Sequence, residues 1–138
     1  MTRDDVEAAV RRFHDVRKSN DAAQVRALFV DEPEFLLAGV PGETSVACSA
    51  CGAEDFAAAA QQLNENWGWE NVEFLDMVIE GATAAVRYRL TVRFTPLDRV
   101  FDTEVYDLME FENGKIKRLL QYADTGFLSG VVAEALAS

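Results

Sequence analysis

Asp107 is the residue whose type and setting point most directly to chemistry. It lies in FDTEVYDLMEFE (residues 101–112), where apolar and polar residues alternate as in a half-buried strand. It is the only charged residue on the more apolar face of that strand, between Val105 and Met109. A carboxylic acid on an apolar wall loses hydration, which favours its neutral form and lets it donate a proton.

Asp124 is the second candidate, and the hairpin register decides whether it joins Asp107. Asn113-Gly114 predicts a tight two-residue turn, because both residues tolerate positive φ. That turn would place Asp107 opposite Leu120 and bring Tyr122 and Asp124 to the same face. A three-residue turn would shift the pairing by one residue and move Asp124 to the opposite face. We prefer the two-residue turn, because it pairs apolar residues beside the loop.

Two carboxylates with unequal surroundings can divide the roles of general acid and general base, so Asp107 and Asp124 form the candidate catalytic pair. Each has a structural alternative. Asp107 could hydrogen-bond a nearby hydroxyl or backbone group. Asp124 could cap the following helix through the amide of Gly126 or Phe127, and for this residue the cap is the favoured interpretation.

Further side chains are expected to line a binding pocket around Asp107. Tyr88 would place a hydroxyl on an apolar strand face, although core packing is its commoner role. His14 could shuttle a proton, although a histidine beside an apolar stripe more often lies at the surface or is partly buried. The remaining expected pocket residues are apolar or aromatic: Phe13, Phe35, Leu37, Trp67, Val105, Met109 and Tyr122.

Helices in the first half of the chain and strands in the second half must position these residues. Apolar residues at helical spacing predict helices over residues 3–18 and 54–67, with a short helix between them that ends at Pro33. Alternation and turn residues predict strands over residues 34–40, 45–48, 72–79, 84–94 and 101–112, then a partner strand and a closing helix near residues 127–135. This order indicates an α+β fold: three N-terminal helices packed on a curved, mostly antiparallel sheet, with a short C-terminal helix.

Length and charge exclude several classes of function. A chain of 138 residues fits one domain, residues 1–138. The net charge of −11 argues against a nucleic-acid partner, whose phosphates need a basic face. No apolar run is long enough to span a membrane and the first residues lack a signal-peptide core, so we expect no membrane partner and a cytoplasmic location.

Cys48 and Cys51 are the remaining residues with possible redox or metal chemistry. A structural zinc site needs two more ligands, and the only histidine is far away in sequence. We therefore expect two reduced thiols, no metal site and no cofactor.

The order of elements and the segment Val105–Phe111, followed by a glycine turn, resemble the ketosteroid-isomerase and SnoaL-like polyketide-cyclase group of the nuclear transport factor 2-like (NTF2-like) superfamily. The resemblance implies a cystatin-like cone in which the sheet curls around the first helix. It implies a pocket for an apolar small molecule, no cofactor, and a homodimer formed through the outer sheet face.

The resemblance also implies roles for individual positions. Asp107 matches the aspartate that helps hold an enolate oxygen in ketosteroid isomerases, where an apolar site keeps that carboxylic acid neutral. The family's catalytic tyrosine falls on Phe13 and its general base falls near Leu37, so steroid isomerisation is not expected. Asp124 can take the place of the cyclases' acid/base aspartate. The arginine of related epoxide hydrolases falls on Val105, so that match fails.

We therefore expect a small-molecule-binding domain that moves a proton in the manner of an isomerase, cyclase or dehydratase. The alternative is a non-catalytic dimeric domain for ligand binding or assembly. Its outer sheet face would carry cross-strand charge pairs between three arginines and three acids: Arg87, Arg89 and Arg93 opposite Asp102, Glu104 and Glu110.

Overall fold

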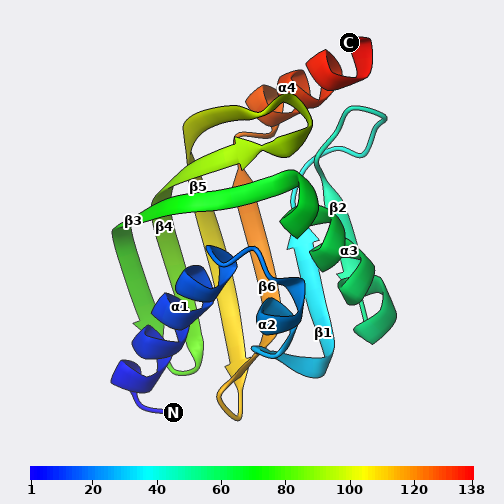
Figure 1. Ribbon diagram of the computed structural model, residues 1–138. Coiled ribbons are helices and arrows are strands. Elements are labelled where there is room, and N and C mark those ends of the chain that lie inside the picture. Colours follow the sequence, from blue (N-terminus) through cyan, green and yellow to red (C-terminus); the bar gives the residue numbers. More distant parts are fainter.

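The computed structural model describes all 138 residues and confirms the α+β class (Figure 1). Its elements follow in the order α1 (Arg3–Arg17), α2 (Ala22–Arg26), β1 (Phe29–Leu37), β2 (Cys48–Cys51), α3 (Ala53–Asn66), β3 (Trp67–Glu80), β4 (Thr83–Phe94), a 3-10 turn (Thr95–Leu97), β5 (Arg99–Glu112), β6 (Lys115–Ala123) and α4 (Thr125–Ala137). The six strands form one mixed sheet in the order β2-β1-β6-β5-β4-β3. Only β1 and β6 pair in parallel, so the sheet is mostly antiparallel, as predicted.

Helices α1 to α3 lie on one face of the sheet, and α4 lies at one end of it (Figure 1). Helix α1 begins at a capping box, in which Thr2 and Asp5 each bond the other's backbone amide. Its buried stripe includes Val6, Val10 and Phe13, and it ends with the buried side chain of Arg17. No helix is both long enough and apolar enough to cross a membrane.

The prediction that the second helix runs up to Pro33 is wrong. That helix has only five residues, and β1 begins at Phe29 with Pro33 inside it. The pairing of β1 with β6 shifts between Phe29 and Glu34, an irregularity that accommodates a residue without an amide hydrogen. The Pro33 carbonyl still accepts a hydrogen bond from the Gly52 amide at 3.0 Å. Long-range strand pairing therefore outweighs the local helical pattern here.

The β5–β6 hairpin has the predicted two-residue turn but not the predicted register. Asn113 and Gly114 both have positive φ, and Phe111 pairs with Ile116. Lys117 is then an extra residue on β6, a β-bulge, because Glu110 pairs with Arg118. The bulge shifts every later pair by one residue.

This shift corrects the prediction for the candidate site. Asp107 lies opposite Gln121, not Leu120. Gln121 faces the interior, whereas Tyr122 is 57% exposed on the other face. A prediction from the turn alone therefore assigns the wrong residues of β6 to the interior.

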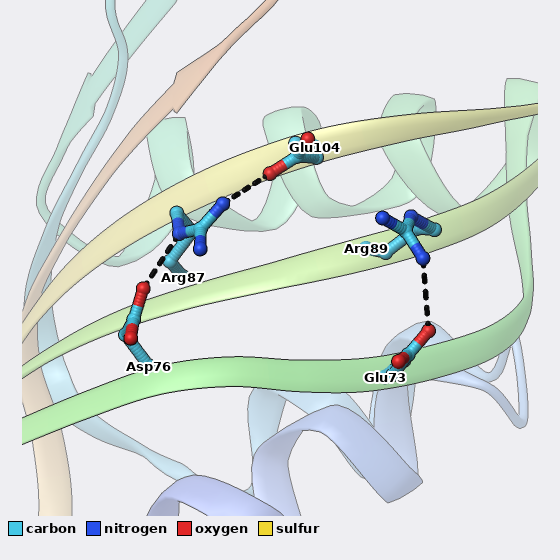
Figure 2. A network of polar contacts seen from close by, with 5 residues as sticks. All are labelled: Glu73, Asp76, Arg87, Arg89 and Glu104. Atoms are coloured by element: carbon cyan, nitrogen blue, oxygen red, sulfur yellow. Dashed lines mark hydrogen bonds and ion pairs between the residues drawn. The ribbon is translucent and has the colours of Figure 1, made fainter.

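The outer face of the sheet carries a network of charge pairs (Figure 2). Arg87 bonds Asp76 at 2.7 Å and Glu104 at 2.6 Å, and Arg89 bonds Glu73 at 3.2 Å. The predicted pairing across the strands is confirmed for Arg87 with Glu104. The other two predicted acids have different partners: Asp102 accepts from Thr91, and Glu110 pairs with Arg118.

Candidate functional site

Three side chains from three elements form a buried polar cluster beneath α1. Asp107 on β5 is 0% exposed and lies among apolar core residues. The Tyr88 hydroxyl on β4 donates to Asp107 Oδ2 at 3.0 Å. His14 Nε2 on α1 is 3.2 Å from the same oxygen. The strand pattern therefore correctly predicts that Asp107 faces the interior, and long-range packing supplies its two partners.

Hydrogen bonding limits the arrangement of protons in this cluster to two forms. His14 Nδ1 lies 2.7 Å from the Val10 carbonyl, which can only accept, so Nδ1 carries a hydrogen. Nε2 then either accepts a proton from a neutral Asp107 or donates one as part of a charged imidazolium. In both forms one proton lies between His14 and Asp107, and the pair is neutral overall.

One oxygen of the cluster lacks a partner. Asp107 Oδ1 is buried and accepts no hydrogen bond, and it is the only buried side-chain polar atom in the molecule without one. An unsatisfied buried polar atom costs about 1–3 kcal/mol. Such an atom is unusual in a native interior and marks a place where a ligand, a water molecule or a reacting group could bond.

The Tyr88 hydroxyl remains a hydrogen-bond donor over the whole neutral range. Burial raises the pKa of Tyr88 well above its usual value, and the neighbouring Asp107 raises it further. Tyr88 can therefore support charge on Asp107 without losing its own proton.

An apolar pocket lies next to the cluster, between the sheet and α3. It has a volume of about 80 Å³. Its apolar lining comes from five strands, two helices and a loop: Leu37, Val46, Leu63, Trp67, Trp69, Leu90, Val92, Val105, Ala123 and Leu128. Drug-sized ligand pockets have volumes of about 300 Å³ or more, so this pocket is smaller than a conical cavity of that kind.

The apolar pocket borders an outer groove beside α4. Leu63, Trp67 and Val46 line both this pocket and an outer groove of about 420 Å³ that extends along α4. These three side chains therefore separate the two spaces. Movement of Trp67, which is only partly buried, would join them.

A second, aromatic pocket of about 40 Å³ lies on the other side of Arg17. Phe13 and Phe35 are among its walls. Arg17, Leu63 and Gln121 line both pockets, so they form the partition between them.

Arg17 is the most unusual group at this partition, because it is a buried cation, 6% exposed. Its guanidinium carbon lies 4.8 Å from the centre of the Trp69 ring. Burial lowers the pKa of Arg17 to about 10, which corresponds to a cost of about 3 kcal/mol for keeping the charge inside. Its hydrogen bonds go to neutral oxygens: Asn20 Oδ1 at 3.1 Å, Asn64 Oδ1 at 3.3 Å, the Leu63 carbonyl at 3.1 Å and the Trp67 carbonyl at 2.7 Å.

A family model described as a SnoaL-like domain matches residues 10–119 of this chain. The chain belongs to the SnoaL-like family. This confirms the resemblance inferred from the hairpin segment and the element order. Comparison with curated proteins finds no significant sequence match.

Solved structures of NTF2-like proteins share the fold of the SnoaL-like chain. An NTF2-like protein from Burkholderia xenovorans LB400 has a TM-score of 0.73 at 18% identity, covering 96% of this chain and 98% of that one. An LEH-like epoxide hydrolase from M. tuberculosis has a TM-score of 0.70 at 19% identity, covering 97% of each chain. A ketosteroid isomerase-like protein from Erwinia carotovora atroseptica SCRI1043 has a TM-score of 0.64 at 19% identity, covering 86% of this chain and 93% of that one. At these identities the likeness is one of fold.

The residues expected to line the pocket of this SnoaL-like chain fall into four groups. Leu37, Trp67 and Val105 line the apolar pocket, and Phe13 and Phe35 line the aromatic one. The other two groups line neither pocket: His14, Tyr88 and Met109 are fully buried, and Tyr122 is exposed on the outer face.

Asp124 does not join Asp107. Its side chain accepts a hydrogen bond from the Phe127 amide at 3.1 Å and caps α4, which confirms the structural alternative for this residue. The β-bulge at Lys117 accounts for the separation, because it reverses the faces of the residues that follow. The candidate acid–base pair is therefore Asp107 with His14.

Arg17 and Gln121 were not expected in the site. Arg17 continues the apolar stripe of α1, and a charge in such a stripe is the signal that could have identified it. Gln121 has no comparable signal, because its orientation depends on the bulge. Cys48 and Cys51 are free thiols, and no three His, Cys, Asp or Glu side chains cluster in a way that could hold a metal ion.

Proposed function

We propose that this SnoaL-like chain binds a small, mainly apolar molecule in the apolar pocket. One observation carries the proposal: a pocket with apolar walls has three polar side chains in its lining, Arg17, Thr103 and Gln121. Apolar walls with a few placed polar groups are the usual composition of a small-molecule site.

The pocket volume limits the ligand. An apolar cavity of about 150 Å³ holds benzene, and the pocket here has about half that volume. A ligand of a few non-hydrogen atoms therefore fits without rearrangement. A longer ligand would extend past Trp67 into the outer groove.

We also propose that the site can move a proton without a cofactor, as an isomerase, cyclase or dehydratase does. The proton between Asp107 and His14 is the exchangeable one, and the unpartnered Oδ1 is the atom that a substrate would bond after a rearrangement, because Asp107 lines neither pocket. Trp69 connects the cluster with the apolar pocket, since it lines that pocket and packs against His14 and Tyr88. The alternative is a binding domain of the same fold with no reaction, in which Asp107 only holds α1 on the sheet.

A pocket-filling variant tests the binding proposal. Ala123→Leu adds three carbon atoms on the pocket wall, and Ala85→Leu makes the same change on the outer face of β4. A library of small apolar molecules would be screened by protein-detected NMR, and Kd would be measured for each hit. We expect Ala123→Leu to weaken binding at least about tenfold and Ala85→Leu to leave it unchanged. Equal binding to both variants would place the ligand outside this pocket.

Hydrogen exchange tests the reaction. A bound ligand with an acidic C–H bond would be incubated in deuterated water, and deuterium incorporation would be followed by mass spectrometry. The proposal expects catalysed exchange that Asp107→Asn abolishes while ligand binding persists. No exchange above the uncatalysed rate in the wild type would leave the non-catalytic alternative, and equal catalysed exchange in Asp107→Asn would exclude Asp107 as the catalytic group.

A further inference from the structure

We propose that the ligand of the apolar pocket carries a single carboxylate, which Arg17 recognises. This inference rests on the proposed binding function and names the chemical class of the ligand. It follows from the charge balance around the pocket.

The charge of Arg17 has no counter-ion in the protein. Its four hydrogen-bond acceptors are two amide side chains and two backbone carbonyls, all of them neutral. The exposed arginines of the sheet behave differently, because Arg87, Arg89 and Arg93 all pair with carboxylates. Arg17 therefore has its hydrogen bonds satisfied and its charge uncompensated.

The absence of acids around Arg17 is notable in so acidic a chain. The sequence has 24 Asp and Glu residues against 13 Lys and Arg. Neither the apolar nor the aromatic pocket has an Asp or Glu in its lining. A cation in a region of low dielectric constant and without a nearby anion attracts an anion strongly. The lining of the apolar pocket thus contains no acidic residue, and Arg17 is its only charged side chain.

The same groups select a monoanion. Trp69 packs on the guanidinium, and Gln121 adds one amide donor to the pocket lining. A phosphate dianion would require more positive charge and more donors than one arginine, the Gln121 amide and the Thr103 hydroxyl provide. A carboxylate on a short apolar body matches one positive charge, two neutral donors and apolar walls.

A purely structural role for Arg17 is the competing interpretation. Its hydrogen bonds connect the end of α1 with the end of α3 and the start of β3, and this connection alone could account for its burial. The experiment must therefore measure ligand charge preference and not only stability.

Matched acids and amides provide that measurement. Straight-chain carboxylates of three to eight carbons and the corresponding primary amides would be titrated at pH 7 by calorimetry, or by NMR where binding is weak. The two series have nearly the same shape and differ in charge. We expect the best acid to bind at least about tenfold more tightly than its amide.

Two variants of Arg17 test whether this residue causes the preference for acids over amides. Arg17→Met should bring acid and amide to within about twofold, whereas Arg17→Lys should retain part of the difference. Arg26→Met is the matched control, because Arg26 also stacks on an aromatic ring and bonds backbone carbonyls but lines neither pocket. It should keep the wild-type preference.

The outcomes separate the two proposals. Amides that bind as tightly as acids would overturn charge recognition and leave the binding proposal in place. A preference for acids that survives in folded Arg17→Met would overturn the role of Arg17. Failure of both series to bind would overturn the binding proposal together with this one. Should Arg17→Met not fold, the wild-type comparison of acids with amides decides the ligand class by itself.

Discussion

At the scale of single residues, Asp107 holds the cluster together through one oxygen atom. Its Oδ2 contacts both the Tyr88 hydroxyl and His14 Nε2. Removing the carboxyl group leaves two buried polar groups without partners, so Asp107→Ala should lower the free energy of unfolding by about 3 kcal/mol. Asp107→Asn keeps an N–H that can face Nε2, and we expect less than half of that loss. Urea unfolding measures both, and equal losses would contradict this description of the cluster.

Tyr88 should make the free energy of unfolding depend on pH in the alkaline range. Its pKa is raised in the folded state, so the unfolded chain loses this proton first as the pH rises past about 10. The stabilisation from neutral Tyr88 is therefore complete below pH 10 and declines above it. Between pH 9 and 11 the wild type should lose about 1 kcal/mol more than Tyr88→Phe, measured by denaturant unfolding at each pH. Parallel pH curves for the two proteins would contradict the assignment.

The sequence predicts the inward orientation of Asp107 because a single acid stands out on an apolar strand face. It does not predict that His14 is the partner, since the contact spans 93 positions of the chain. Arg17 carries a signal that is easily misinterpreted, because a long side chain at the end of an apolar stripe usually extends into solvent.

At the scale of elements, α4 depends on the cap that Asp124 provides. Asp124→Ala removes the acceptor for the Phe127 amide and should destabilise the protein by about 1 kcal/mol. Asp124→Asn should retain most of the stability, because asparagine caps equally well. Neither change should alter ligand affinity by more than about twofold. Thermal unfolding measures the stability and ligand titration measures the affinity. A large loss of affinity in Asp124→Asn would show that this residue takes part in ligand binding.

The β-bulge marks the limit of element prediction from this sequence. Asn113-Gly114 correctly predicts the turn, because the turn chemistry is local. The following strand contains Leu119 and Leu120 side by side, so apolar alternation is consistent with either residue facing inwards. The structure buries Leu119 at 2% exposure, because packing against the helices selects one register.

At the scale of the whole molecule, the fold follows from the sequence and the pocket size does not. The order of helical and strand periodicities is enough to indicate helices on one face of a mostly antiparallel sheet. The free volume is what remains after large side chains such as Trp67 and Trp69 have packed, and spacing along the chain does not encode it.

The outer sheet face is where we propose that two copies of the chain associate. Tyr106 and Tyr122 lie opposite each other on β5 and β6 and are 42% and 57% exposed, beside the charge network of Figure 2. Sedimentation velocity should detect a dimer, and Tyr106→Glu should shift it to monomer by burying an added charge in the interface. A wild type that is monomeric at all concentrations tested would rule this interface out.

The most direct measurement of the central claim is the location of a bound ligand. Methyl-labelled protein would be saturated with the tightest small-molecule probe, and intermolecular nuclear Overhauser effects would be recorded. The proposal predicts contacts with the methyl groups of Leu37, Leu90 and Val105, which line the apolar pocket but not the outer groove. Contacts confined to the outer groove or the outer sheet face, or none at saturation, would contradict it.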